Sequence, residues 1–110
     1  MKNNQIKFDK TNGLIPAIIQ DDKTSEVYML GYMNKLALEK TRKSRRVYFW
    51  SRSRKKLWMK GETSGNTLRV TKIFLDCDGD TLLISVILMG KNVCHTGSMT
   101  CFNTELSVTK

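Results

Sequence analysis

The sequence TLLISVILM, from Thr81 to Met89, is the most apolar stretch of this 110-residue chain, and Ser85 is its single polar residue after Thr81. Its apolar side chains occupy both odd and even positions, so both faces of a strand built from it need cover. The stretch therefore predicts a strand at the centre of a barrel or at a subunit interface. At this length it is far too short for the roughly 20 residues that span a bilayer.

Toward the amino terminus, short apolar runs alternate with polar turns, which is typical of a chain of strands. We predict strands at residues 15–20, 26–33, 47–50, 57–60, 67–76 and 81–89, and one helix at 35–43 with Asn34 as its N-cap. Pro16 suggests an edge strand or the beginning of a strand. The apolar positions of 67–76 change parity, which a bulge near Thr71 would explain. Residues 90–110 show little periodicity and are expected to be mostly loop.

These elements predict a single domain, residues 1–110, of mainly β (α+β) class, with compact barrel-like sheets and one short helix. The first ten residues are polar and lack the apolar core of a secretory signal. We therefore expect a soluble cytoplasmic protein. We expect no disulfide framework among the three cysteines, because the cytosol keeps thiols reduced.

Positive charge is concentrated in one segment of the chain. The net charge is +9, and residues 40–60 carry ten basic residues and no acidic one, while the rest of the chain is almost neutral. Such a field attracts phosphate on a nucleic acid, on an anionic membrane or on a small metabolite. Charge alone does not choose among these partners.

Aromatic side chains interleave with the cations of this segment, which leaves two functional interpretations open. Tyr48, Phe49, Trp50 and Trp58 among the basic residues could stack on a single-stranded nucleic acid. Alternatively, the segment and the loop after it could hold the phosphates of one nucleotide. The candidate phosphate-binding residues are Arg52, Arg54, Lys60, Thr63 and Ser64. An extended backbone from Ser51 to Arg54 would place both arginines on one face. A solvated face with ordinary core aromatics is the third interpretation.

The densest group of carboxylates is Asp76-Cys77-Asp78-Gly79-Asp80. Three carboxylates this close repel one another unless a cation neutralises them, and their hard oxygen donors suit Mg²⁺ or Ca²⁺. An EF-hand is excluded, since the twelfth position counted from Asp76 is Ile87 rather than Glu. A solvated acidic turn remains the alternative.

Cys77, Cys94 and Cys101 are the only cysteines. An extended backbone would point the Cys77 thiol away from its neighbouring carboxylates, which suggests two separate metal positions. Three thiolates would leave the fourth tetrahedral position of a zinc ion open, as in catalytic zinc sites. Three buried, inert thiols are the alternative. His95, the single histidine, could close the site as a fourth ligand or serve as a proton shuttle.

Four motifs in this order resemble phosphoribosyl-AMP cyclohydrolase of histidine biosynthesis, over about residues 13–102. They are Trp50-Ser51-Arg52-Ser53-Arg54, Leu57-Trp58 with Lys60 to Asn66, the aspartate group at 76–80, and Cys94-His95-Thr96-Gly97 with Cys101-Phe102. One departure from the family pattern is the loop Gly90-Lys91-Asn92-Val93, where a proline commonly follows the glycine.

The resemblance implies a homodimer in which the sheets are completed or packed. It implies hydrolysis of the N1–C6 bond of phosphoribosyl-AMP to the formimino-aminoimidazole carboxamide ribotide, the third step of histidine biosynthesis. In the family, zinc is held by the cysteines, here Cys77, Cys94 and Cys101, with the first shared across the dimer. Mg²⁺ is held by the aspartates, here Asp76, Asp78 and Asp80.

His95 is our candidate for moving the proton from water to the departing nitrogen. Because the chain ends eight residues after Phe102, we expect the monofunctional form, without the pyrophosphohydrolase domain fused to some members. The rival hypotheses are a small module that binds single-stranded nucleic acid and a structural zinc protein without activity. Under the preferred hypothesis, the partners are a phosphorylated nucleotide and a second copy of the chain, with no nucleic acid or membrane.

Overall fold

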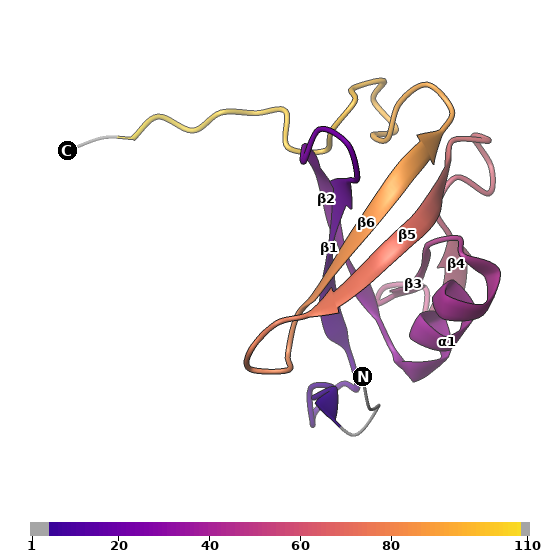
Figure 1. Cartoon of the computed structure of the whole chain (residues 1–110), viewed down its shortest axis with the longest axis vertical. Coiled ribbons are helices and arrows are strands. Elements are labelled where there is room, and N and C mark those ends of the chain that lie inside the picture. The colour runs from indigo at the N-terminus through magenta and orange to yellow at the C-terminus, as the bar shows by residue number, and fades with distance from the viewer. Residues whose placement is uncertain (1–4, 109–110) are drawn as a thin grey trace.

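The computed structural model describes residues 5–108, so the ends of the expected domain 1–110 lie outside the described residues (Figure 1). Its elements follow one another as β1 (Ile15–Asp21), β2 (Val27–Met33), α1 (Lys35–Ser44), β3 (Tyr48–Ser51), β4 (Lys56–Met59), β5 (Thr67–Leu75) and β6 (Leu82–Met89). The mainly β class with one short helix is confirmed. The α1 helix is not long and apolar enough to cross a membrane, and it is the one helix that the described residues contain.

The strands form two separate sheets rather than a barrel. A four-stranded sheet has the order β2-β1-β6-β5, and β3 pairs with β4 in a two-stranded sheet. The pairs are antiparallel except for β1 and β6, which are parallel. Since β2 and β5 do not pair with each other, the larger sheet stays open. The expected barrel-like arrangement is therefore wrong for residues 5–108.

Two features of the larger sheet explain its irregular sequence pattern. The register between β5 and β6 shifts between Val70 and Lys72, which confirms the bulge predicted near Thr71. Pro16 lies in an interior strand, so the edge-strand alternative is wrong, but it does stand near the beginning of that strand. Parallel pairing of β1 with β6 begins one residue later, at Ala17, so the missing N–H of Pro16 costs no bond to β6.

The helix is capped as the sequence predicts. The Asn34 side chain accepts a hydrogen bond from the N–H of Ala37 at 2.9 Å, and the helix ends where Arg45 adopts a left-handed conformation. The buried hydroxyl of Thr41 donates to the carbonyl of Ala37 and accepts from the N–H of Tyr48 at 3.0 Å. This single hydroxyl therefore ties α1 to β3.

The hydrophobic core lies between the inner face of the larger sheet and the α1–β3 unit. Phe49 is 1% exposed, and its ring packs so closely on Gly31 of β2 that a Cβ there would lie 2.4 Å from it. No side chain fits at position 31 without displacing the ring, so this glycine allows the two sheets to approach. Phe49 also contacts Trp58 of β4, with ring centroids 5.2 Å apart.

The central strand β6 is fully covered on one face alone. Leu82, Ile84 and Val86 are completely buried, whereas Leu83 and Ile87 on the outer face of the sheet are half-buried. Phe74 on the neighbouring strand is 51% exposed on that same face. Cover on both faces is thus not achieved within residues 5–108 of one chain. The subunit-interface interpretation of this strand stays a prediction.

Tyr28→Phe is expected to lower the free energy of unfolding by about 1–2 kcal/mol near neutral pH. The buried Tyr28 hydroxyl donates to Asp21 Oδ1 at 2.8 Å. Burial and this hydrogen bond raise the pKa of Tyr28 to about 12. Hydrogen bonds from Thr24 and from the Tyr28 hydroxyl lower the pKa of Asp21 despite some desolvation.

The sign of the pH dependence follows from these directions. Because the raised pKa favours protonated Tyr28 in the folded state, its contribution is complete below about pH 10 and lost as the pH rises toward 12. The stability difference between wild type and Tyr28→Phe, measured by urea unfolding, should therefore shrink between about pH 10 and pH 12. A difference that stays constant across that range would contradict the assignment.

Candidate functional site

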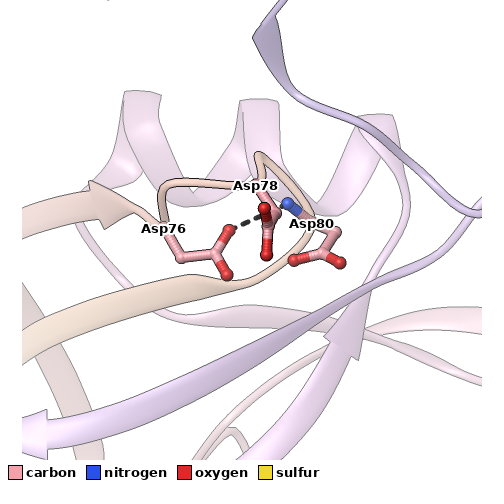
Figure 2. Close-up of side chains that lie close together, drawn as sticks. All are labelled: Asp76, Asp78 and Asp80. Atoms are coloured by element: carbon pink, nitrogen blue, oxygen red, sulfur yellow. Dashed lines mark hydrogen bonds between the residues drawn. The ribbon is translucent and has the colours of Figure 1, made fainter.

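The acidic turn between β5 and β6 places three carboxylates together (Figure 2). Oxygen atoms of Asp76, Asp78 and Asp80 all lie within 4.8 Å of one another, and the three residues are exposed. The N–H of Asp80 donates to Asp76 Oδ1 at 3.0 Å, and Gly79 supplies the positive φ of 78° that closes the turn. Desolvation raises the pKa of Asp76, but hydrogen bonds from the Asp80, Thr81 and Gly79 backbone lower it on balance. This group could hold a metal ion.

Cys77 lies in the same turn and is exposed. The extended backbone that would point the Cys77 thiol away from its neighbouring carboxylates is not present here, because the N–H of Gly79 donates back to the carbonyl of Asp76 at 3.0 Å and folds the chain. A cavity of about 570 Å³ borders the turn and is lined by Lys7, Asp76, Cys77 and Asp78, among others. A ligand that reaches Cys77 thus passes close to the carboxylates.

Cys94 and Cys101 come together at the opposite end of the larger sheet. Cys94 is 6% exposed in the loop that follows β6. Cys101 is held at the edge of β2, where its N–H donates to the carbonyl of Tyr28 at 2.7 Å. The two thiols are close enough for each to shift the pKa of the other.

The surroundings of this thiol pair lower the pKa of Cys94 and raise that of Cys101. Hydrogen bonds from Thr96, whose hydroxyl lies 3.1 Å from Cys94 Sγ, lower the pKa of Cys94, and Cys101 and the charge of Lys60 lower it further. Partial desolvation and the neighbouring Cys94 raise the pKa of Cys101, although the residue as a whole is exposed. Two neighbouring cysteine sulfur atoms close to a lysine are a chemically suitable pair of soft metal ligands. His95 is exposed next to Cys94.

One chain does not bring all three cysteines together. Cys77 lies just before β6 and Cys94 lies just after it, and eight residues of strand separate the two ends of β6 by roughly 25 Å (Figure 1). The aspartates are therefore also remote from the thiol pair. A centre that contains all three thiols needs a second copy of the chain.

The basic residues predicted to bind phosphate do not line a single cavity. The guanidinium of Arg52 stacks over the Tyr32 ring, 4.2 Å from its centroid, at a cavity of about 590 Å³ that Trp50 and Trp58 also line. Arg54 and Thr63 line a second cavity, of about 350 Å³, together with Lys56 and Glu62. Lys60 lies close enough to the cysteine pair for its charge to lower the pKa of both thiols. Ser64 accepts from the N–H of Asn66 within its own turn.

The segment after β3 is a turn, so the extended geometry that would place Arg52 and Arg54 on one face is not present. Lys55 adopts a φ of 52°, its N–H donates to the carbonyl of Ser51, and the Ser51 hydroxyl accepts from the N–H of Arg54. The turn sends Arg52 and Arg54 to different cavities. Sequence reasoning missed Tyr32 and Glu62 as cavity residues, since neither belongs to the basic segment.

The contacts of the loop at residues 90–93 bear on the departure from the family pattern, the missing proline after Gly90. The N–H of Lys91 donates to Asn66 Oδ1 at 3.0 Å, and Gly90 approaches Asn66 so closely that a Cβ would collide with it. A proline at position 91 has no N–H for this bond. Asn66, the last residue of the second motif, therefore anchors the loop that leads to Cys94.

The sequence that forms this site matches a known protein family. The sequence model of phosphoribosyl-AMP cyclohydrolase matches residues 29–103, which run from β2 through the acidic turn to the thiol pair. The chain belongs to this family. Phosphoribosyl-AMP cyclohydrolase of Clostridium botulinum (strain Alaska E43) is 55% identical over 103 residues, which cover 94% of each chain.

Bifunctional members of the family are equally similar. The histidine biosynthesis bifunctional protein HisIE of Staphylococcus aureus (strain COL) is 57% identical over 100 residues, and that of Photobacterium profundum is 53% identical. Both alignments cover 91% of this chain, but 47% and 48% of the relatives. The chain thus spans about half the length of these curated relatives, and it aligns over nearly the whole length of the cyclohydrolase.

Proposed function

We propose that this protein is a phosphoribosyl-AMP cyclohydrolase that hydrolyses the N1–C6 bond of the adenine ring and acts as a cytoplasmic homodimer in histidine biosynthesis. The observation that carries the proposal is the family match over residues 29–103, together with 55% identity to a cyclohydrolase along nearly the whole chain. The pairing of Cys94 with Cys101 beside Lys60 supports it, because such a pair is a suitable partial metal site.

The proposed zinc site combines Cys94 and Cys101 of one chain with Cys77 of a second copy. Two soft donors already lie together in one chain, and the third is too remote to join them without a second subunit. Three thiolates leave the fourth tetrahedral position open. Zinc held in such a site lowers the pKa of water and supplies a nucleophile near neutral pH.

The chain's own contribution to the reaction is proton transfer and substrate placement. Ribosylation at N1 makes C6 of the adenine electrophilic, so water can attack that carbon. In our proposal His95, which is exposed beside Cys94 in sequence, accepts the proton from water and delivers it to the departing N1 nitrogen. The bond formed is C6–O and the bond broken is N1–C6.

Mg²⁺ is the proposed occupant of the aspartate group. Three exposed carboxylates within 4.8 Å of one another offer the hard oxygen donors that Mg²⁺ prefers. Because Asp76 and Asp78 flank Cys77, a second copy that contributes Cys77 to the thiol pair also brings these carboxylates to the site. An ion there would neutralise part of the charge of a phosphorylated substrate.

Arg54→Ala should raise KM by roughly ten- to a hundredfold and change kcat far less, because it removes a charge-assisted phosphate contact. Arg54 lines the cavity of about 350 Å³ with Lys56 and Thr63, which offers two cations and a hydroxyl to one phosphate. The Glu62 carboxylate also lines this cavity and accepts a hydrogen bond from the N–H of Met59. Lys43→Ala is the matched control, since it removes an exposed cation of the same basic segment in the last turn of α1. Equal KM values in the two variants would contradict the phosphate role of this cavity.

The proposed activity is tested by following absorbance while phosphoribosyl-AMP is mixed with the zinc-loaded protein. Steady conversion supports the cyclohydrolase. No conversion with tightly bound zinc supports a structural zinc protein. Micromolar binding of single-stranded nucleic acid that weakens steeply with salt, again without conversion, supports the nucleic-acid module.

A further inference from the structure

The segment 102–108, which we call the arm, leaves the body of the molecule and runs away from it (Figure 1). Phe102, Leu106 and Val108 are 63%, 81% and 101% exposed, and they stand at alternating positions with Thr104 between them. Alternation of this kind is typical of an extended segment with one side buried. The arm therefore has an apolar side that residues 5–108 of its own chain leave uncovered.

The arm is firmly fixed where it begins. The Thr100 hydroxyl donates to the carbonyl of Val27 at 2.7 Å. The N–H of Cys101 donates to the carbonyl of Tyr28. Asn103 makes the last contacts with the body, to the carbonyl of Thr100 and to Cys94 Sγ. In the described part of the chain, residues 104–108 form no hydrogen bond with the body. The direction of the arm is thus set beside the thiol pair.

An apolar groove of about 370 Å³ lies on the outer face of the larger sheet, at the other end of β6. Ile18, Phe74 and Leu83 line it, and Asp76 and Thr81 of the acidic turn border it. Phe74 is half exposed there. Like the arm, this groove is apolar and uncovered within the described chain.

We propose that the arm of one copy lies in this groove of a second copy, so that each subunit of the dimer clasps the other. The inference rests on the shared cysteine centre of the proposed function. Cys101 immediately precedes the arm, and Cys77 immediately follows Asp76 at the rim of the groove. When Cys77 of one copy lies beside Cys101 of the other, Phe102 of that second copy lies within a few residues of the first copy's groove. Seven extended residues then reach roughly 20 Å across the sheet.

Charge favours the same approach of the two copies. The turn that carries Cys77 holds three carboxylates, whereas the thiol pair lies near Lys60 at the end of the basic segment. Opposite charges that meet in this way orient the encounter and disfavour other registers. A two-fold axis makes the contact reciprocal, so both arms and both grooves are used.

Leu106→Asp tests the buried side of the arm, with Ser107→Asp as the matched control on its other side. Sedimentation measurements should show that Leu106→Asp raises the dimer dissociation constant by about tenfold or more, whereas Ser107→Asp leaves it near the wild-type value. A wild-type dissociation constant for Leu106→Asp, or equal weakening by both variants, would overturn the proposal.

Zinc content separates this proposal from the shared centre. At concentrations where Leu106→Asp is still dimeric, it should keep its zinc, because the arm supplies no ligand. Cys77→Ser should lose zinc at every concentration. If Cys77→Ser keeps its zinc, the shared centre is wrong. If Cys77→Ser loses its zinc but Leu106→Asp has the wild-type dissociation constant, the shared centre stands and the arm contact is wrong.

Photocrosslinking identifies the surface that the arm touches. With p-benzoylphenylalanine in place of Leu106, in an equal mixture of isotope-labelled and unlabelled chains, we expect attachment between chains near Ile18, Phe74 or Leu83. The same probe in place of Ser107 should label these residues far less. Attachment within one chain, or to another surface of the second copy, would refute the groove as the docking site.

Discussion

Cys77→Ser and Cys101→Ser proteins should each be inactive and lack tightly bound zinc, yet chains of the two kinds expressed together should recover about a quarter of wild-type activity. In the proposed dimer each single variant breaks both sites, because every proposed site takes Cys77 from one chain and the Cys94–Cys101 pair from the other. The separation of these groups by the length of β6 is the physical reason.

The recovered fraction follows from counting sites. Random pairing makes about half of the dimers mixed, and each mixed dimer contains one intact site and one that lacks two thiols. One site in two, in half of the molecules, is about a quarter of the total. Zinc bound per chain, measured after gel filtration, should recover in the same proportion as the rate.

The matched control is a mixture of Cys94→Ser and Cys101→Ser chains. Both changes fall on the same side of the shared site, since the two thiols lie together in one chain. No pairing of these chains creates an intact site, so neither zinc nor activity should return. Recovery in this control, or none in the Cys77 mixture, would show that the three thiols do not form a centre across the dimer.

His95→Ala should lower kcat by about a hundredfold or more, the usual scale for the loss of an acid–base group, and leave zinc bound. His95 is exposed beside the buried Cys94, so its removal leaves no cavity in the core. We therefore expect the free energy of unfolding to stay near the wild-type value. The limb of the pH–rate profile that reports the proton acceptor should disappear in the variant.

Three measurements on one protein sample separate a catalytic from a structural role of His95. Retained zinc and stability with a large loss of kcat support proton transfer. Loss of zinc together with activity would make His95 the fourth ligand instead, which closes the site. An unchanged pH–rate profile in His95→Ala would remove this residue from the mechanism.

Much of the secondary structure was predictable because it depends on near neighbours in the chain. The cap of α1 is a contact between Asn34 and Ala37. The bulge of β5 is visible in the sequence because the apolar positions change parity within residues 67–76. Where prediction failed, local hydrogen bonds competed with extended structure. The Ser51 hydroxyl accepts a hydrogen bond from the N–H of Arg54, which makes a turn after β3. In the acidic turn, the N–H of Gly79 donates to the carbonyl of Asp76.

The sequence named the candidate ligands of the site, but it did not give their positions relative to one another. Residue types identified the thiols and the carboxylates as candidate metal ligands, and the order of the motifs identified the family. The role of Lys60 beside the thiols, the stacking of Arg52 on Tyr32 and the bond from Lys91 to Asn66 join residues that are far apart in sequence. No short pattern reports contacts of that range.

The amino-acid sequence alone determined the family, the strand pattern and which side chains could bind metal, because each of these depends on residue type and short-range order. The tertiary structure decided where these ligands lie. Since β6 keeps Cys77 and Cys94 at opposite ends of a rigid sheet, the thiols form one pair and one remote partner within a chain. The length of that strand is the physical reason why the proposed three-thiol centre would require a second subunit, and no spacing in the sequence shows it.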